Sequence, residues 1–302
     1  MGDLAKREKA NMNEMTSICF ALKEYGQIGP KLFQQLMIIY GHPDNVFRQT
    51  AEDISAMAGI SLERATRAVE AQYAIDKAIK QIEQLQTINI QIISFFDDDY
   101  PQMFRAISDP PLVIYLKGDS KLLDSGGVAI VGTTAADQDG LRHAVDFARG
   151  FAGVGKTVIS GLAMGIDTAA HLGCIQNGGK TIAVLGCGHL NIYPEENTPL
   201  AGMIAESGAV ISEYDIYADP IPGRLVSRNR LIAALAEVVL VVQIGENRKG
   251  ELYAARAAAE QGKPVFMLDP DNRHDGHDIL DDSYMKIQGV NQIDEIMAYM
   301  VR

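Results

Sequence analysis

The stretch TVISGLAMGIDTAAHLGCIQ, residues 157–176, contains the junction that decides the fold. An apolar run at 157–160 leads through a glycine-containing turn into a predicted helix at 167–176. The chain repeats this unit. Apolar runs at 128–131, 157–160, 181–185, 209–212, 238–242 and 264–268 alternate with predicted helices at 139–151, 167–176, 196–207, 228–236 and 252–261. Short, nearly all-apolar strands separated by helices predict a doubly wound α/β domain, in which helices cover both faces of a parallel sheet.

The first 82 residues have a different pattern. Apolar residues recur at spacings of three and four, glycine-containing breaks fall at 26–30 and 41–43, and a long helix is predicted over 62–85. We interpret 1–82 as a small helical domain. It is either a packing or dimer module or a helix-hairpin-helix-like binder of DNA backbone, and its sparse cations favour the first interpretation.

Strand-like runs at 89–96 and 112–116 open a second domain, predicted over 83–272. The remaining residues, 273–302, form an acidic tail, and a last strand at 285–290 and a closing helix at 292–299 are predicted within it. The motif at 274–278 contains two histidines and two aspartates without a strict ligand spacing, so a solvated turn is favoured over a metal site.

The charge balance restricts the kind of partner. Among 302 residues, 27 are Lys or Arg and 39 are Asp or Glu, which gives a net charge of −12. Such a chain cannot coat a nucleic acid with its whole surface, so any anion site has to be local. The N-terminus has no signal-peptide pattern and the most apolar stretch, 231–245, is too short to span a membrane, which predicts a cytoplasmic protein.

Glycines follow most of the predicted strands at the edge where ligands of open parallel sheets bind. They allow backbone N–H groups to approach an anion closely, so a phosphate-bearing ligand is predicted. The candidate phosphate-binding residues in these turns are Gly132, Thr133, Thr134, Ser160, Gly161, Gly165, Asp167, Lys249 and Gly250. Asp167 is also a candidate N-cap of its helix.

Arg228, Asn229 and Arg230 begin another predicted helix, where two guanidinium groups could grip phosphates. The segment 224–273 holds eight basic residues against six acidic ones, a local excess of positive charge. The alternative is that the arginines form structural ion pairs with Glu213, Asp215 or Glu237. Tyr193 or Tyr217 could stack on a base, although tyrosines in such loops are equally often part of the core.

Residues 150–157, GFAGVGKT, match the phosphate-binding loop pattern of nucleoside triphosphatases. A working loop of that type leaves a strand and opens a helix, whereas here a predicted helix precedes the motif and a strand follows it. We therefore expect an αβ turn at 150–157. No catalytic constellation is found, and neither an enzyme activity, a metal nor another cofactor is predicted.

Six motifs carry a family resemblance: SGLAMGID (160–167), AAH (169–171), AVLGCG (183–188), YPEEN (193–197), ISEY (211–214) and SRNRLIAAL (227–235). Together with the lead-in DDDYPQMFRAISDPPLVIYLKGD (97–119), they resemble the DNA-processing protein A family, also called Smf. The resemblance implies an extended Rossmann-like domain behind a sterile-alpha-motif-like helical domain, with no winged-helix domain in the short tail. It also implies a cytosolic homodimer without catalytic activity that binds single-stranded DNA and hands it to a RecA-type recombinase, typically during natural transformation.

The chain departs from the family pattern at cationic positions. The family's Gly-Ser-Arg after the first Rossmann strand is here Gly132-Thr133-Thr134, and the basic residue of its glycine motif is Met164. Loss of two cationic contacts is expected to weaken phosphate binding by about 2–4 kcal/mol. A second hypothesis therefore stays open: a Rossmann-type pocket for a small nucleotide, as in nucleotide sensors or nucleoside-monophosphate phosphoribohydrolases.

Overall fold

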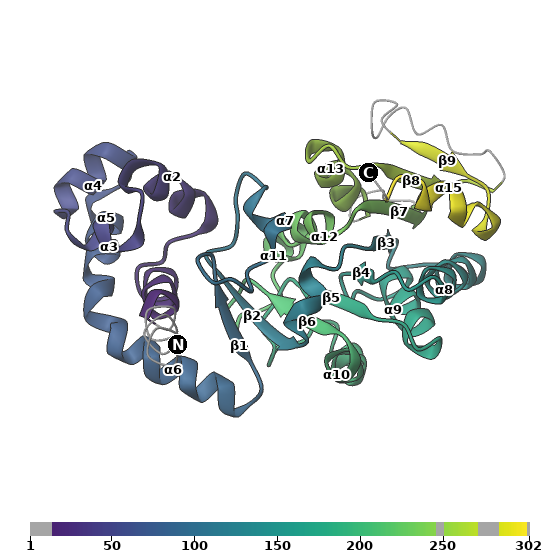
Figure 1. Cartoon of the computed structure of the whole chain (residues 1–302), viewed down its shortest axis with the longest axis horizontal. Coiled ribbons are helices and arrows are strands. Elements are labelled where there is room, and N and C mark those ends of the chain that lie inside the picture. The colour runs from purple at the N-terminus through teal and green to yellow at the C-terminus, as the bar shows by residue number, and fades with distance from the viewer. Residues whose placement is uncertain (1–13, 246–250, 271–283, 301–302) are drawn as a thin grey trace, which may run out of the picture. The chain divides into compact units, whose positions relative to one another are not determined.

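A computed structural model describes residues 14–245, 251–270 and 284–300. The chain divides into two compact units, residues 1–116 and residues 117–302 (Figure 1). No helix within the described ranges is both long enough and apolar enough to cross a membrane.

The first unit is helical in its N-terminal part. A helix over 14–24 precedes α2 (Pro30–Tyr40), α3 (Pro43–Phe47), α4 (Ala51–Ala58), α5 (Leu62–Glu70) and α6 (Ile75–Thr87). The side chains of Thr50 and Ser61 accept hydrogen bonds from the first turns of α4 and α5, as N-cap residues do. The single helix predicted over 62–85 is wrong, because a 3₁₀ turn at Ala71–Ala74 separates α5 from α6. The sequence AQYA contains neither glycine nor proline, so no local signal marks this break.

Strands β1 (Gln91–Ser94) and β2 (Val113–Gly118) pair antiparallel, and the short helix α7 (Gln102–Arg105) lies between them in sequence. They belong with the helical part because side chains tie the two together. Thr16 Oγ1 donates to Asp97 Oδ1 at 2.8 Å, and the Tyr115 hydroxyl donates to Glu24 Oε1 at 2.6 Å. The compact unit thus extends to Leu116, whereas the division into 1–82, 83–272 and 273–302 stays a prediction.

The second unit is built on a parallel sheet. Its strands are β3 (Val128–Gly132), β4 (Val158–Ser160), β5 (Thr181–Leu185), β6 (Ala209–Ser212), β7 (Val238–Gln243), β8 (Val265–Leu268) and β9 (Met285–Ile287). They lie in the order β6-β5-β4-β3-β7-β8-β9, and every neighbouring pair is parallel. The chain builds outward from β3 to β6 and then returns to place β7 on the other side of β3. The crevice between β3 and β7 is therefore a topological switch point.

Helices cover both faces of this sheet, as predicted (Figure 1). The helices are α8 (Gln138–Gly153), α9 (Ile166–Gln176), α10 (Thr198–Ser207), α11 (Pro222–Ser227), α12 (Asn229–Leu235), α13 (Glu251–Glu260) and α15 (Ile293–Met297). Val128 and Ile130 of β3 pack in one core with residues of α8 and α9. Because successive strand residues point to opposite faces, Ala129 and Val131 are left for the face of α12 and α13. The predicted α/β class, with a mostly parallel sheet behind a helical region, is confirmed.

The segment 150–157 forms an αβ turn. Helix α8 ends at Gly153, Gly155 has a left-handed φ of 75°, and β4 begins at Val158. Lys156 Nζ lies 3.0 Å from Glu237 Oε2, at the amino ends of the strands. The predicted order of helix before strand is confirmed, and it turns the lysine away from the edge where ligands bind.

His171 of α9 is fully buried, and it lies against the first residues of β5 and β4. Its Nδ1 lies 2.7 Å from Thr181 Oγ1, and the Thr181 hydroxyl donates to the Val158 carbonyl at 2.8 Å. The imidazole therefore donates from Nδ1, and Nε2 has no hydrogen-bond partner within the described structure. Burial, reinforced by the charge of Arg228, lowers the pKa of His171 to about 3.

A fall in pH from 7 to 5 should therefore destabilise the protein. Unfolded His171, with a pKa near 6.5, takes up a proton in this window, whereas the folded residue does not. The folded state loses about 2 kcal/mol relative to the unfolded state from this residue. Urea denaturation at pH 7 and pH 5 measures the free energy of unfolding. Between these pH values, the decrease should be smaller in His171→Gln than in the wild type by about 2 kcal/mol. Equal drops for the wild type and the variant would contradict the prediction.

Candidate functional site

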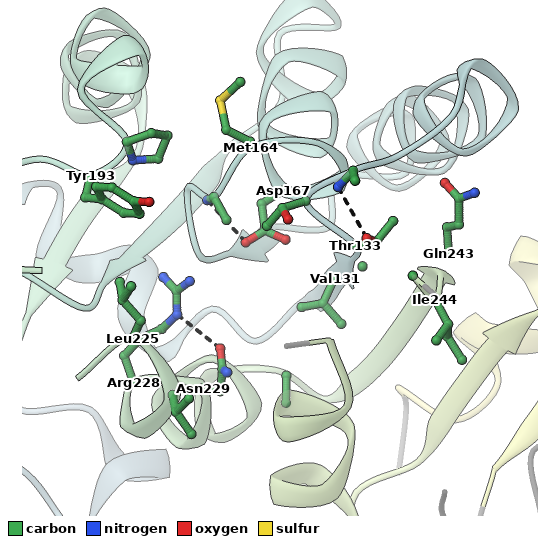
Figure 2. A pocket seen from close by; sticks show the side chains of 18 of the residues that line it. Val131, Thr133, Met164, Asp167, Tyr193, Leu225, Arg228, Asn229, Gln243 and Ile244 are labelled. Atoms are coloured by element: carbon green, nitrogen blue, oxygen red, sulfur yellow. Dashed lines mark hydrogen bonds between the residues drawn. The ribbon is translucent and has the colours of Figure 1, made fainter. Parts of the chain in front are cut away.

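A pocket of about 960 Å³ opens at the carboxyl edge of the sheet in the second unit (Figure 2). It lies at the switch point, because its walls include the ends of β3 and β7. The loop after β4 and the start of α12 complete it. The lining residues are Val131, Gly132, Thr133, Thr134, Ala135, Asp137, Ala163, Met164, Asp167, Tyr193, Pro194, Leu225, Val226, Arg228, Asn229, Gln243, Ile244, Gly245 and Ala254. This is the place at which doubly wound sheets bind their ligands.

The loop between β4 and α9 is fixed by Asp167. Its Oδ2 accepts hydrogen bonds from the N–H groups of Gly161 at 3.1 Å and Ala163 at 3.4 Å. The N-cap of α9 is Gly165, so the prediction that Asp167 caps the helix is wrong: the carboxylate points back to the loop instead. Gly165 has a φ of 74°, and a Cβ there would collide with the Thr133 carbonyl. Only glycine allows the two loops to approach so closely.

Arg228 lies at the base of the pocket with 6% of its surface exposed. Its guanidinium donates to the carbonyl oxygens of Gly161 and Val184. Its Nε donates to Asn229 Oδ1 at 3.0 Å (Figure 2). Burial lowers the pKa of Arg228, and the charge of Asp167 opposes this shift. In turn, burial raises the pKa of Asp167, and Arg228 opposes that shift. The two charges compensate each other inside the protein.

The structure brings six predicted site residues together on the pocket wall: Gly132, Thr133, Thr134, Asp167, Arg228 and Asn229. Gly161 and Gly165 lie in the loop beneath it, and the Ser160 hydroxyl is turned to the Ile130 carbonyl at 2.6 Å. Arg230 forms an ion pair with Glu213. This is one of the structural pairs weighed as the alternative to phosphate binding. Lys249 and Gly250, like the histidines at 274–278, lie outside the described residues.

Two side chains that the sequence analysis missed hold the pocket loops. Gln243 donates to Asp137 Oδ2 at 2.8 Å, and its Oε1 accepts from the Asp137 N–H at 3.2 Å. Asn197 donates to the Leu162 carbonyl and to Thr168 Oγ1, each at 2.8 Å. Gln243 could have been found from the sequence, because it is a polar residue at the end of an otherwise apolar strand. Asn197 stands in the YPEEN motif without a spacing that would reveal its partners.

Backbone donors remain open on the pocket wall. Within the part of the chain that the structure describes, the N–H groups of Thr134 and Met164 make no hydrogen bond. Met164 directly precedes the N-terminus of α9, an 11-residue helix whose dipole favours negative charge. The same described residues contain no group of three metal-ligating side chains. The wall is therefore suited to hold an anion through neutral donors.

Comparison with known proteins identifies the family to which the chain belongs. The model of the DNA recombination-mediator protein A family matches residues 91–298. The DNA processing protein DprA of Streptococcus pneumoniae is 33% identical over 238 residues, which are 78% of this chain and 81% of that protein. The chain belongs to the DNA-processing protein A family.

Solved structures of DprA proteins agree with this membership. The X-ray structure of the S. pneumoniae protein aligns with a TM-score of 0.78 at 28% identity, over 93% of this chain and 97% of that chain. A second solved structure concerns the single-stranded DNA binding mode of DNA processing protein A from Helicobacter pylori. It aligns with a TM-score of 0.61 at 32% identity. This alignment covers 69% of this chain and 96% of that one.

Relatives differ in length. The Smf protein of Synechocystis sp. is 32% identical over 245 residues, which are 80% of this chain but 61% of that protein. This chain thus spans less than two thirds of that relative.

Two residues at which the sequence departs from the DprA family pattern, Thr134 and Met164, lie on the pocket wall. Thr134, where the resemblance places an arginine of the family, is exposed, and Met164, where it places a basic residue, is 47% exposed. Both side chains can therefore meet a ligand without a rearrangement of the core.

Removal of the buried guanidinium should destabilise the fold. Arg228→Ala leaves Asp167 without its counter-charge and removes the guanidinium that donates to two carbonyls, so we expect a loss of about 3–5 kcal/mol in the free energy of unfolding. Arg142→Ala is the control, because that side chain is 64% exposed and pairs with Asp139 on the surface. Its loss should stay below about 0.5 kcal/mol. Similar urea midpoints for the two variants would contradict a structural role for Arg228.

Proposed function

We propose that this DprA family member binds single-stranded DNA at the carboxyl edge of its sheet, with the pocket between β3 and β7 at the centre of the site. The observation that carries the proposal is the pocket itself. Open backbone donors and the N-terminus of α9 meet there, at the switch point of a fold whose family match covers residues 91–298. The single-stranded DNA binding described for the H. pylori relative supports it.

Neutral donors carry much of the binding in this proposal. Of the basic residues between 224 and 273, Arg228 is buried and Arg230 pairs with Glu213. Lys263 Nζ donates to the carbonyls of Ala233 at 2.9 Å and Ala236 at 2.7 Å. These three cations serve the protein rather than a ligand. Affinity should therefore be modest and should respond to each cation that is added at the pocket.

Thr134→Arg should strengthen the binding of oligo-dT. The new guanidinium stands at the exposed position where the family has its arginine, and one charge-assisted contact contributes about 1–2 kcal/mol, or roughly tenfold in affinity. Fluorescence anisotropy across a salt series should also show a slope that is steeper by about 0.7. Thr134→Gln, which adds length without charge, is the control. No oligo-dT binding by the wild type at low salt would overturn the proposal.

Transfer of the strand to a RecA-type recombinase is the next step that we propose, together with the homodimer implied by the resemblance. The test is the DNA-dependent ATPase of the recombinase on oligonucleotide coated with single-strand-binding protein. The wild-type chain should shorten the lag before the recombinase reaches its full ATPase rate. Thr134→Glu, which places an acid at the pocket, should shorten it less. Equal lags with and without the wild-type chain would remove this step and leave DNA binding in place.

A small nucleotide is the second candidate ligand, because the pocket volume of about 960 Å³ lies within the range of small-molecule sites. A ligand at one hundred times its Kd stabilises a fold by about 2.7 kcal/mol. A thermal shift with a nucleoside monophosphate, combined with no binding of oligo-dT, would favour this function over DNA binding.

A further inference from the structure

Two loops of the second unit, residues 188–191 and 215–221, are bound together into one surface, which we call the two-loop platform. Donors on the first loop bind carbonyls on the second. The hydrogen bonds run from the Gly188 N–H to the Ala218 carbonyl and from the Leu190 N–H to the Ile216 carbonyl, both at 2.9 Å, and from the Asn191 side chain to the Tyr217 carbonyl at 2.7 Å. None of the described residues that line the pocket comes from either loop, so the platform is a separate surface.

The platform adjoins one end of the pocket. Figure 2 shows Tyr193 and Leu225 on the same side of the pocket. The first loop ends two residues before Tyr193, and the second loop ends four residues before Leu225. A molecule that docks on the platform therefore lies beside whatever the pocket holds.

Three large apolar side chains of the platform face water. Leu190 is 51% exposed, Tyr217 is 66% exposed and Ile221 is 48% exposed. The hydrogen bonds between the loops hold the backbone that carries these side chains, so their exposure does not come from a loose chain. Tyr217 was a candidate for base stacking in the sequence, and it lies here rather than on the pocket wall. Exposed apolar side chains that gather on one surface mark an interaction site, and tyrosine is enriched among the residues that dominate interface energies.

The chain segment that carries the platform has only negative charge. Residues 181–223 contain six acidic residues and no Lys or Arg. The acidic residues are Glu195, Glu196, Glu206, Glu213, Asp215 and Asp219. Asp215 and Asp219 belong to the platform itself, and Asp219 is exposed. The next cation along the chain, Arg224, lies over the Tyr214 ring and donates to the Asp219 carbonyl at 2.8 Å, so it serves the loop.

This combination of charge and apolar surface selects the kind of partner. The aspartates would repel a phosphate backbone, which argues against DNA on the platform. Two copies of this chain that met platform to platform would bring like charges together. A protein segment with Lys or Arg beside apolar side chains avoids both problems. Its apolar side chains would cover Leu190, Tyr217 and Ile221, and its cations would meet the aspartates.

We propose that the two-loop platform is the docking surface for a basic, amphipathic segment of a partner protein. The inference does not rest on DNA binding, because the platform lies outside the pocket. A partner held there stands next to the pocket without competing for it.

The first test measures the binding of a fluorescein-labelled helical peptide of leucine and lysine by fluorescence anisotropy. The wild type should bind it, and should not bind a matched peptide in which glutamate replaces lysine. Tyr217→Ala should weaken binding roughly fivefold to thirtyfold, as the loss of a central interface residue does. The double variant Asp215→Asn/Asp219→Asn retains the acceptor oxygens of both side chains. It should weaken binding and make it less dependent on salt.

Two controls separate the platform from general attraction to an acidic chain. Tyr73→Ala removes a tyrosine that is 83% exposed in the first unit. Glu52→Gln/Glu70→Gln removes two exposed acids of the same unit. Both controls should stay within about twofold of the wild type. Equal losses in the platform variants and the controls would overturn the proposal, as would no binding of the basic peptide to the wild type.

A second arm locates the peptide and tests the other occupants. A photoreactive group on the peptide should cross-link to 188–191 or 215–221, and cross-links confined to other segments would contradict the proposal. Weaker binding of oligo-dT by Tyr217→Ala would assign the platform to DNA instead. Self-association of the wild type in sedimentation that Tyr217→Ala abolishes would assign it to a second copy. Failure of the wild type to bind oligo-dT would remove the proposed DNA function and leave the platform in place.

Discussion

The site depends on one buried cation. The Arg228 guanidinium joins the loop after β4, through the Gly161 carbonyl, to the end of β5, through the Val184 carbonyl. Asp167 compensates its charge and binds the loop amides from the other side. A Cβ on Gly161 would collide with the guanidinium, so this glycine serves the close approach of the arginine. The ends of β4 and β5 keep their relation to one another because a charge that is costly to bury is bound there by two carbonyls and by the Asn229 side chain.

This arrangement changes how the positive charge in 224–273 should be understood. A count of residues suggests a basic surface, yet Arg228, Arg230 and Lys263 are bound by groups of the protein. In the proposed function, the groups that meet an anion in the described pocket are instead backbone N–H groups and the N-terminus of α9. In an acidic chain, neutral donors of this kind attract a phosphate locally without a basic surface.

Sequence reasoning succeeded where the signal was local and periodic. The apolar runs gave β3 to β8 to within two residues, and the order of helix and strand around Lys156 explained why its motif is a turn. It also identified the loops that meet at the pocket. It could not decide whether Arg228 faces solvent or carbonyls, because the same SRNR segment is compatible with both. The contacts of Asn197 and Gln243 join residues 35 and 106 positions apart, and no pattern within a single segment reveals them.

The walls of the pocket come from segments spread between Val131 and Ala254. No hairpin, βαβ unit or other local piece contains the binding surface, so it exists only after strands distant in the chain have paired. The ribosome must synthesise the chain beyond residue 254 before the pocket can form. A shorter nascent chain contains some of the lining residues but not the assembled pocket. Fragments that end before α13 are therefore poor substitutes for the full chain in ligand-binding studies. In this architecture, the pocket forms only late in folding, after the strands that carry its walls have paired.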